Sequence, residues 1–196
     1  STTYVGRIES SDDFGWRIYK EARLRGLYRA KEVVILTDGA RYNKTIAQDR
    51  FPHATQIIDL YHAREKLHDL SKLLLNEDQR DRIQTEWQET LDTGHIEELT
   101  ESIRAYLPRS GKRRREGLVI IQYFVDNAEH MRYGEFRKKG FFVGSGVIEA
   151  GCRSLIGQRL KKSGMFWSIQ GANDIIASRC CQFSHRFESF WEESVA

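Results

Sequence analysis

The chain has 196 residues, of which 40% are hydrophobic and 30% are charged, and its formal net charge is +3. These values fit a soluble globular protein with one sizeable core, or one domain carrying a large insertion, and exclude a largely disordered chain. No apolar run approaches the roughly 18 residues of a membrane helix and no signal peptide is visible, so we expect a cytoplasmic protein. Cys152, Cys180 and Cys181 lack a Cys-x-x-Cys spacing, which predicts reduced, buried thiols.

The first third of the chain alternates predicted strands and helices. Short β-branched and apolar runs predict strands, and segments with helical spacing or N-cap residues predict the helices between them. In chain order we expect a strand at 2–8, a helix at 14–28 after N-cap candidates at 10–13, a strand at 33–36, a helix at 43–49 and a strand at 55–60. This order indicates parallel strands in an α/β layer.

After His62 the pattern changes to charged segments with apolar residues at helical spacing. Helices are predicted at 63–75, 77–90, 96–106 and 118–131, and further helices resume at Val147 and Ile169. We therefore divide the chain into a partial α/β core at 1–62, an all-helical insertion at 63–140, and C-terminal helices of the core at 141–196.

Basic residues concentrate in the C-terminal half of the chain, in the runs 109–115, 137–139 and 153–162, whereas acidic residues concentrate between Glu65 and Glu101. One such run alone is typical of a solvated surface. Three runs together favour a nucleic-acid partner. In the last run the cations lie beside Met165, Phe166 and Trp167, which suits phosphate and base contacts, although these three residues fit a place in the core equally well.

Three acids occupy positions that suit phosphoryl transfer. Asp38 and Asp59 each follow an apolar strand, and Glu149 stands early in a helix after the Gly144-Ser145-Gly146 turn. Acids at the carboxyl ends of parallel strands meet at one sheet edge, and a two-metal site needs such carboxylates around divalent cations. The alternative for Asp38-Gly39 is a simple turn.

Two further residues accompany these acids. His62 is three residues after Asp59, so both fall on one helical face if the chain turns helical at Leu60. Arg153, four residues after Glu149, either pairs with it or binds a phosphate. A structural role is open for both.

Several motifs occur in one order along almost the whole chain. They are Thr37-Asp38-Gly39-Ala40, Phe51-Pro52-His53-Ala54, Asp59-Leu60-Tyr61-His62-Ala63-Arg64-Glu65, Tyr123-Phe124 with Asn127, Gly144-Ser145-Gly146-Val147-Ile148-Glu149 and Gly157-Gln158-Arg159-Leu160-Lys161-Lys162-Ser163-Gly164-Met165. In this combination the chain resembles an ISKra-type insertion-sequence transposase, from the group of DDE transposases similar to Mutator elements.

The resemblance implies an RNase H-like catalytic core that is interrupted by an α-helical insertion. It implies that Asp38 and Glu149 are the second and third acids of a catalytic triad that holds Mg²⁺ or Mn²⁺, supported by Asp59 and His62. Residues predicted to contact DNA are Arg113, Arg114, Arg115, Arg153, Arg159, Lys161, Lys162 and Trp167. The implied partners are transposon ends and target DNA in the bacterial nucleoid, and the implied full-length protein is a homo-oligomer without a membrane association.

The first acid of the triad and the first strands of the fold have no match in these residues, because Asp12 and Asp13 precede a helix as caps. We therefore expect a C-terminal part of a transposase that is inactive alone. Two alternatives remain open: a non-catalytic DNA-binding remnant of a transposase, and a two-metal RNase H-like nuclease.

Overall fold

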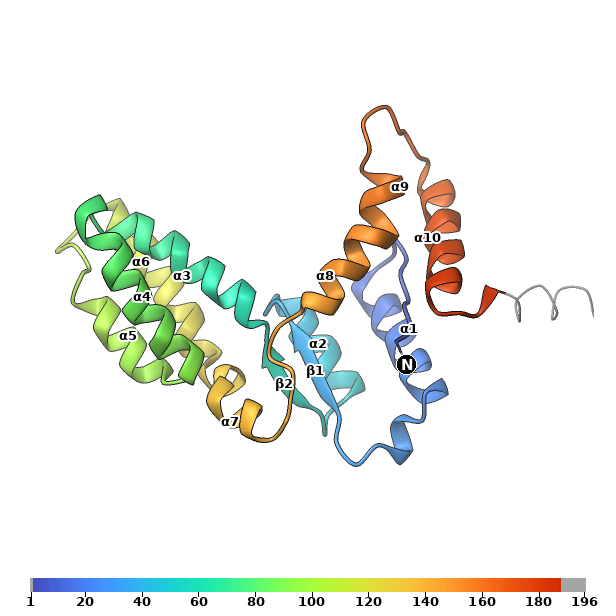
Figure 1. Cartoon of the computed structure of the whole chain (residues 1–196), viewed down its shortest axis with the longest axis horizontal. Coiled ribbons are helices and arrows are strands. Elements are labelled where there is room, and N and C mark those ends of the chain that lie inside the picture. The colour runs from blue at the N-terminus through green and yellow to red at the C-terminus, as the bar shows by residue number, and fades with distance from the viewer. Residues whose placement is uncertain (1, 188–196) are drawn as a thin grey trace, which may run out of the picture. The chain divides into compact units, whose positions relative to one another are not determined.

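A computed structural model describes residues 2–187, except for the side chains of 147–149. The chain forms two compact units (Figure 1). Unit 1 comprises residues 1–33, 45–52 and 146–196, and unit 2 comprises residues 34–44 and 53–145. The residues predicted as one α/β core, 1–62 and 141–196, are thus distributed over both units.

Unit 2 contains a two-stranded parallel sheet (Figure 1). Strand β1 spans Val34–Thr37 and strand β2 spans Thr55–Ile58, with Val34 opposite Thr55 and Thr37 opposite Ile58. Helix α2, Arg41–Arg50, connects them and passes from unit 2 into unit 1 after Lys44. A parallel pair needs such a crossover connection. The predicted α/β class with a large helical content is confirmed.

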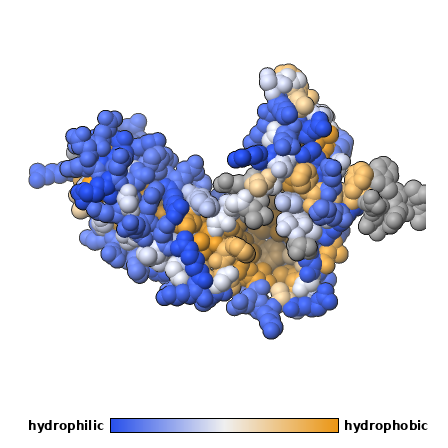
Figure 2. All heavy atoms as spheres, in the orientation of Figure 1, coloured by the Kyte–Doolittle hydropathy of each residue, from blue (hydrophilic) through white to orange (hydrophobic). Residues whose placement is uncertain are grey.

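The rest of unit 2 is helical. Its elements are α3 (Leu60–Leu74), α4 (Glu77–Thr93), α5 (Ile96–Arg104), α6 (Lys112–Asp126), the 3₁₀ helix η2 (Ala128–Met131) and α7 (Tyr133–Lys138). Apolar residues three and four positions apart face inward, and those of α3 are completely or almost completely buried: Leu60, Ala63, Leu67 and Leu70. The outward faces of α3–α6 are largely hydrophilic (Figure 2).

One core runs through unit 2 from the sheet into the helices. It begins at Ile57 and Ile58 of β2, includes Trp87 of α4 and continues to Phe136 of α7. Fully burying one such side chain contributes about 1.5–3 kcal/mol. The close packing also requires a glycine where α4 ends: Gly94 has φ +85°, and a Cβ there would lie 2.6 Å from the Tyr133 nitrogen.

Unit 1 consists of helices around a smaller apolar cluster. Its elements are α1 (Ser11–Leu24), the 3₁₀ turn η1 (Leu27–Arg29), α8 (Gly146–Cys152), the π-helical turn η3 (Arg153–Gly157), α9 (Gln158–Leu160) and α10 (Ile169–Phe183). The cluster is built on Leu155, Ile176 and Cys180. Ser10 caps α1, because its hydroxyl accepts a hydrogen bond from the Asp13 nitrogen at 3.2 Å.

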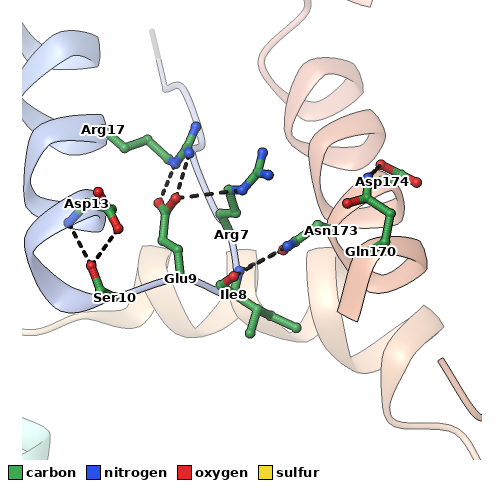
Figure 3. Close-up of polar contacts among 9 residues, drawn as sticks. All are labelled: Arg7, Ile8, Glu9, Ser10, Asp13, Arg17, Gln170, Asn173 and Asp174. Atoms are coloured by element: carbon green, nitrogen blue, oxygen red, sulfur yellow. Dashed lines mark hydrogen bonds and ion pairs between the residues drawn. The ribbon is translucent and has the colours of Figure 1, made fainter. Parts of the chain in front are cut away.

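The predicted strand at 2–8 is wrong: the segment belongs to no sheet of the described residues. Side chains of α10 and of the turn after it replace the partner strand, and Figure 3 shows the contact of Asn173 with Ile8. Asn173 accepts a hydrogen bond from the Ile8 nitrogen at 2.7 Å and donates one to the Ile8 carbonyl at 3.3 Å. Ser184 accepts from the Tyr4 nitrogen at 2.9 Å. Backbone groups of a segment outside a sheet must find such partners when they are withdrawn from water.

All three cysteines are free thiols, as predicted, but only Cys180 is buried. Cys181 is half-buried and Cys152 is exposed, so the expectation of three buried thiols is wrong for these two. Among the described residues no helix combines the length and the apolar character that crossing a membrane requires.

Candidate functional site

Asp38 and Asp59 lie next to each other in the sheet register. Each directly follows the last residue of its strand, and the last residues, Thr37 and Ile58, are paired. The Asp59 nitrogen donates a hydrogen bond to the Thr37 carbonyl at 2.7 Å. Both acids therefore stand at the carboxyl edge of the parallel pair, where α/β proteins commonly bind their ligands.

The carboxylate of Asp38 is exposed but oriented. Its Oδ1 accepts hydrogen bonds from the Ala40 nitrogen and from Nδ2 of Asn43, each at 2.9 Å. Gly39 has φ +82°, a conformation that glycine adopts without a steric penalty. The Asp-Gly pair is thus a turn, as the alternative interpretation held, and this turn presents an acid to solvent.

Asp59 has a different task. It is only 4% exposed and caps α3, because its Oδ1 accepts hydrogen bonds from the Tyr61 nitrogen at 2.7 Å and the His62 nitrogen at 3.3 Å. An aspartate at this position stabilises a helix both by these bonds and by its charge at the positive end of the helix dipole. The carboxylate of Asp59 therefore supports the site by fixing where α3 begins.

Asp59 and His62 are in contact, but through the backbone of His62 and not through its ring. Asp59 contacts the backbone nitrogen of His62, whereas Nδ1 of the His62 ring lies 3.5 Å from a carboxylate oxygen of Glu65, one turn further along α3. The histidine ring is half-buried and contacts Glu65 rather than the carboxylate of Asp59.

Tyr123 of α6 covers the Asp38 turn. Its hydroxyl donates a hydrogen bond to the Asp38 carbonyl at 3.4 Å, and a Cβ on Gly39 would lie 2.9 Å from the hydroxyl oxygen. Burial, with the negative charges of Asp38 and Asp59 as smaller causes, raises the pKa of Tyr123 to about 12. The tyrosine therefore remains a protonated hydrogen-bond donor at neutral pH.

Two buried polar groups lie behind Tyr123. Nδ2 of Asn127 donates to the Tyr123 carbonyl at 2.6 Å, but its Oδ1 has no hydrogen-bond partner in the described part of the chain. The Tyr133 hydroxyl is likewise buried without a partner there. Burial, followed by the influence of Tyr123 and Asp59, raises the pKa of Tyr133. Sequence reasoning did not single out Tyr133, which stands among charged residues, and its local signal is the apolar Phe136 three positions later.

The Gly144 turn also reaches this edge of the sheet. The Leu60 nitrogen donates to the Val143 carbonyl at 2.8 Å, and a Cβ on Gly144 would lie 2.6 Å from the Tyr61 ring. Because Leu60 and Tyr61 open α3 directly after Asp59, the turn is held beside the helix end that Asp59 caps. Only glycine allows this approach without a shift of the tyrosine ring.

Glu149 lies on α8, in unit 1, and its side chain falls outside the described part of the structure. The pairing of Asp38 with Glu149 therefore stays a prediction, as does any contact between Glu149 and Arg153. Arg153 itself is exposed in η3.

The predicted DNA-contacting arginines of α6 differ from one another. Arg113 donates two hydrogen bonds to the Leu73 carbonyl, at 2.8 and 2.6 Å, and Arg114 donates one to the Pro108 carbonyl at 3.0 Å. Arg113 therefore has a structural role at the end of α3, and Arg114 has one in the loop before α6. Arg115 is exposed.

The loop between α9 and α10 is basic and aromatic on its surface. Lys161 and Lys162 of this loop and Arg159 of α9 are exposed, Phe166 is 96% exposed and Trp167 is 43% exposed. The alternative that places these aromatic residues in the core is therefore wrong for Phe166 and Trp167. Cations beside exposed rings suit phosphates and bases.

The described side chains supply one exposed carboxylate at the sheet edge, that of Asp38, and among the side chains described, which do not include 147–149, no group of three or more His, Cys, Asp and Glu residues is placed to hold a metal ion. Carboxylate oxygen is the ligand type that Mg²⁺ and Mn²⁺ prefer. Asp38 therefore fits such an ion in kind, but it does not form a complete site by itself.

Comparison with family models, with curated proteins and with solved structures found no match to this chain.

Proposed function

We propose that this chain is a catalytic part of a DNA transposase with an RNase H-like core, in which Asp38 and Glu149 are acids of a metal-dependent strand-cleavage and strand-transfer site. The observation that carries the proposal is the meeting of two segments at one sheet edge. The exposed acid Asp38 stands there, and the Gly144 turn is held there by α3. Glu149 stands five positions after Gly144.

The other residues have supporting roles in this proposal. Asp59 fixes the start of α3, and Tyr123 holds the Asp38 turn with its protonated hydroxyl. Lys161, Lys162 and Trp167 provide a surface that is suited to DNA. The partners are transposon ends and target DNA in a bacterial nucleoid, with a homo-oligomer as the complete assembly.

The proposed ion is Mg²⁺ or Mn²⁺. When bound, it would stabilise charge on the attacking and leaving oxygens of a phosphodiester. Asp38 supplies one ligand, so the proposal requires others, of which Glu149 is one. Residues 1–196 alone are expected to bind Mn²⁺ weakly and to leave DNA uncut, because two acids stand where the resemblance implies three.

The test measures Mn²⁺ binding by the loss of the free-ion signal in electron paramagnetic resonance. Asp38→Asn and Glu149→Gln should each weaken Mn²⁺ binding, and if both acids hold one ion the double variant should bind Mn²⁺ at least as weakly as either single variant, with a loss that is not the sum of the two single losses. Asp69→Asn, which changes an exposed acid of α3, is the matched control. Unchanged Mn²⁺ binding in Asp38→Asn would refute the assignment of this acid.

Cleavage is examined in parallel with labelled DNA and Mg²⁺ or Mn²⁺. Metal-dependent cleavage by purified residues 1–196 that is abolished by Glu149→Ala would contradict the expected inactivity of this chain. Joining of a cleaved 3′ end to a second DNA would distinguish a transposase from an RNase H-like nuclease.

A second function, DNA binding without catalysis, is favoured by one observation. The loop between α9 and α10 exposes cations and aromatic rings, whereas the described residues at the sheet edge offer a single exposed acid. Salt-sensitive DNA binding that falls in Lys161→Glu and is unaffected by Asp38→Ala, with no cleavage under any metal, would support this alternative.

A further inference from the structure

Helix α1 and the turn η1 carry a groove that has no part in the candidate site described above. It has a volume of about 540 Å³ and is lined by Trp16, Tyr19, Lys20, Arg23, Leu24 and Tyr28. The α1 residues among them are spaced three and four positions apart, so they share one face of the helix. Gly15 of the same helix packs against Ile46 of α2.

Three large apolar or aromatic residues of the groove are exposed. Trp16 is 52% exposed, Tyr28 is 70% exposed and Leu24 is 69% exposed. Single exposed apolar residues are common, but several that gather in one concave surface indicate a binding site.

The rings are also held in place. The Tyr19 and Tyr28 hydroxyls are hydrogen-bonded at 2.7 Å, which fixes η1 against α1. The Tyr19 ring contacts the Trp16 ring with centroids 5.9 Å apart and the Phe51 ring with centroids 5.6 Å apart. The Arg50 guanidinium lies over the Trp16 ring, 4.0 Å from its centroid. The surface is therefore preorganised, and binding of a partner would cost the protein little side-chain conformational entropy.

The charge of the groove is positive. Lys20 and Arg23 line it, and none of the six lining residues is acidic. The acids of α1 are engaged elsewhere: Asp12 pairs with Arg50 at 2.5 Å, Asp13 accepts a hydrogen bond from the Ser10 hydroxyl at 2.6 Å, and Glu21 pairs with Arg186 at 2.8 Å. Neither Lys20 nor Arg23 forms an ion pair with a carboxylate in the described residues, although Arg23 lies over the Tyr28 ring, 5.4 Å from its centroid.

We propose that this groove binds single-stranded nucleic acid, with unpaired bases stacked on Trp16 and Tyr28 and backbone phosphates bound by Lys20 and Arg23. Aromatic rings stack on the faces of unpaired bases, which a duplex does not present, and adjacent cations bind the strand between them. Two cations and no acid favour a polyanion over a peptide. The groove lies entirely within unit 1, whereas Asp38 belongs to unit 2, and none of the residues that line the groove takes part in the proposed cleavage chemistry.

Fluorescence anisotropy with a labelled oligothymidylate measures the affinity. Trp16→Ala with Tyr28→Ala should weaken binding about tenfold, from the loss of stacking, while Tyr42→Ala should leave it unchanged. Tyr42 is a suitable control because it is 53% exposed and lies in unit 2. Weakening by less than about threefold in a folded double variant would overturn the proposal.

Thermal unfolding followed by circular dichroism shows whether the double variant folds. If it does not fold, a second pair of variants tests whether the groove binds the oligothymidylate. Lys20→Glu and Lys72→Glu change the net charge equally, and both lysines are exposed. Lys20→Glu should weaken oligothymidylate binding more strongly than Lys72→Glu, and equal effects would overturn the proposal.

Three further measurements separate other occupants and other sites. An oligouridylate should compete with the oligothymidylate, and a duplex of the same length should compete poorly; preferred binding of the duplex overturns the proposal. If the chain dimerises and the double variant is monomeric with unchanged oligonucleotide affinity, the groove is an interface between copies instead. Asp38→Asn and Glu149→Gln should leave oligonucleotide binding intact, so failure of the transposase assignment would not affect this test.

Discussion

Arg132 forms the most extensive ion-pair network among the residues of unit 2. Its guanidinium donates to both carboxylate oxygens of Glu97, at 2.6 and 2.7 Å, and to Glu129 at 2.7 Å. These bonds link the segment before α7 to the start of α5. Chiefly through the hydrogen bonds from Arg132, the pKa of Glu97 is lowered from 4.5 to about 2.

The lowered pKa of Glu97 predicts how this contact depends on pH. Its contribution is present above pH 4.5, where the group is ionised in the folded and unfolded chain, and is lost as the pH falls to about 2. Glu97→Gln should lower the free energy of unfolding at pH 7 by at most about 1 kcal/mol, because the side chain is 67% exposed. The difference from the unmodified chain should vanish near pH 2.

Urea unfolding, followed by circular dichroism between pH 7 and pH 2, measures this difference. The control is Glu98→Gln, since Glu98 has only a contact of 3.9 Å with His95 and is exposed. A gap between Glu97→Gln and the unmodified chain that stays constant with pH would contradict the role assigned to the ion pair.

Asp38 and Asp59 show how far the sequence predicts the candidate site. Both positions at the strand ends follow from apolar runs, because strand ends are marked locally. Their roles differ through the residues that follow: Gly39 continues into a turn, whereas Leu60 begins a helix that needs a cap. The contact of Tyr123 with Asp38 crosses 85 positions of sequence, and no local pattern predicts it.

At the scale of elements, α3 depends on its cap. Asp59→Ala removes the acceptor of the Tyr61 and His62 nitrogens and should destabilise the chain by about 1–2 kcal/mol, while Asp59→Asn keeps an acceptor oxygen and should cost clearly less. Chemical denaturation measures both, with Asp69→Ala on the exposed surface of α3 as the control. Equal losses in the alanine and asparagine variants would show that capping is not the task of Asp59.

Helices were easier to predict than the N-terminal segment for a physical reason. The predicted helix at 77–90 begins at the observed residue and ends three residues early. It was predictable because its buried residues, which include Ile83, Trp87 and Leu91, repeat at helical spacing. The alternation in residues 2–8 indicates an extended chain but not its partner. That partner consists of the side chains of Asn173 and Ser184, 165 and 180 positions away.

At the scale of the whole molecule, the division into units predicts an independent fragment. Residues 34–145 contain all of unit 2, including both strands and its continuous core, together with the short segment 45–52 of unit 1. We expect this fragment to unfold cooperatively on heating, because a core of this kind supports a domain by itself.

Two comparisons test the fragment. Residues 53–145 lack β1 and the packing of Val34 and Leu36, and should unfold at a lower temperature. Ile46→Ser in 34–145 should not lower the unfolding temperature, because Ile46 packs against Gly15 of unit 1 in the intact chain. A broad, non-cooperative transition of 34–145 by calorimetry would show that unit 2 depends on unit 1.

The contacts of Asn173 and Ser184 with the first residues also impose an order on biosynthesis. Tyr4 and Ile8 leave the ribosome before their hydrogen-bond partners, which are added 180 and 165 residues later. At typical rates of translation this delay is roughly 10 to 30 s. Unit 2 is complete in the nascent chain well before α10, so it can fold while Tyr4 and Ile8 still lack their hydrogen-bond partners. Early termination of translation would therefore leave unit 2 intact and unit 1 incomplete.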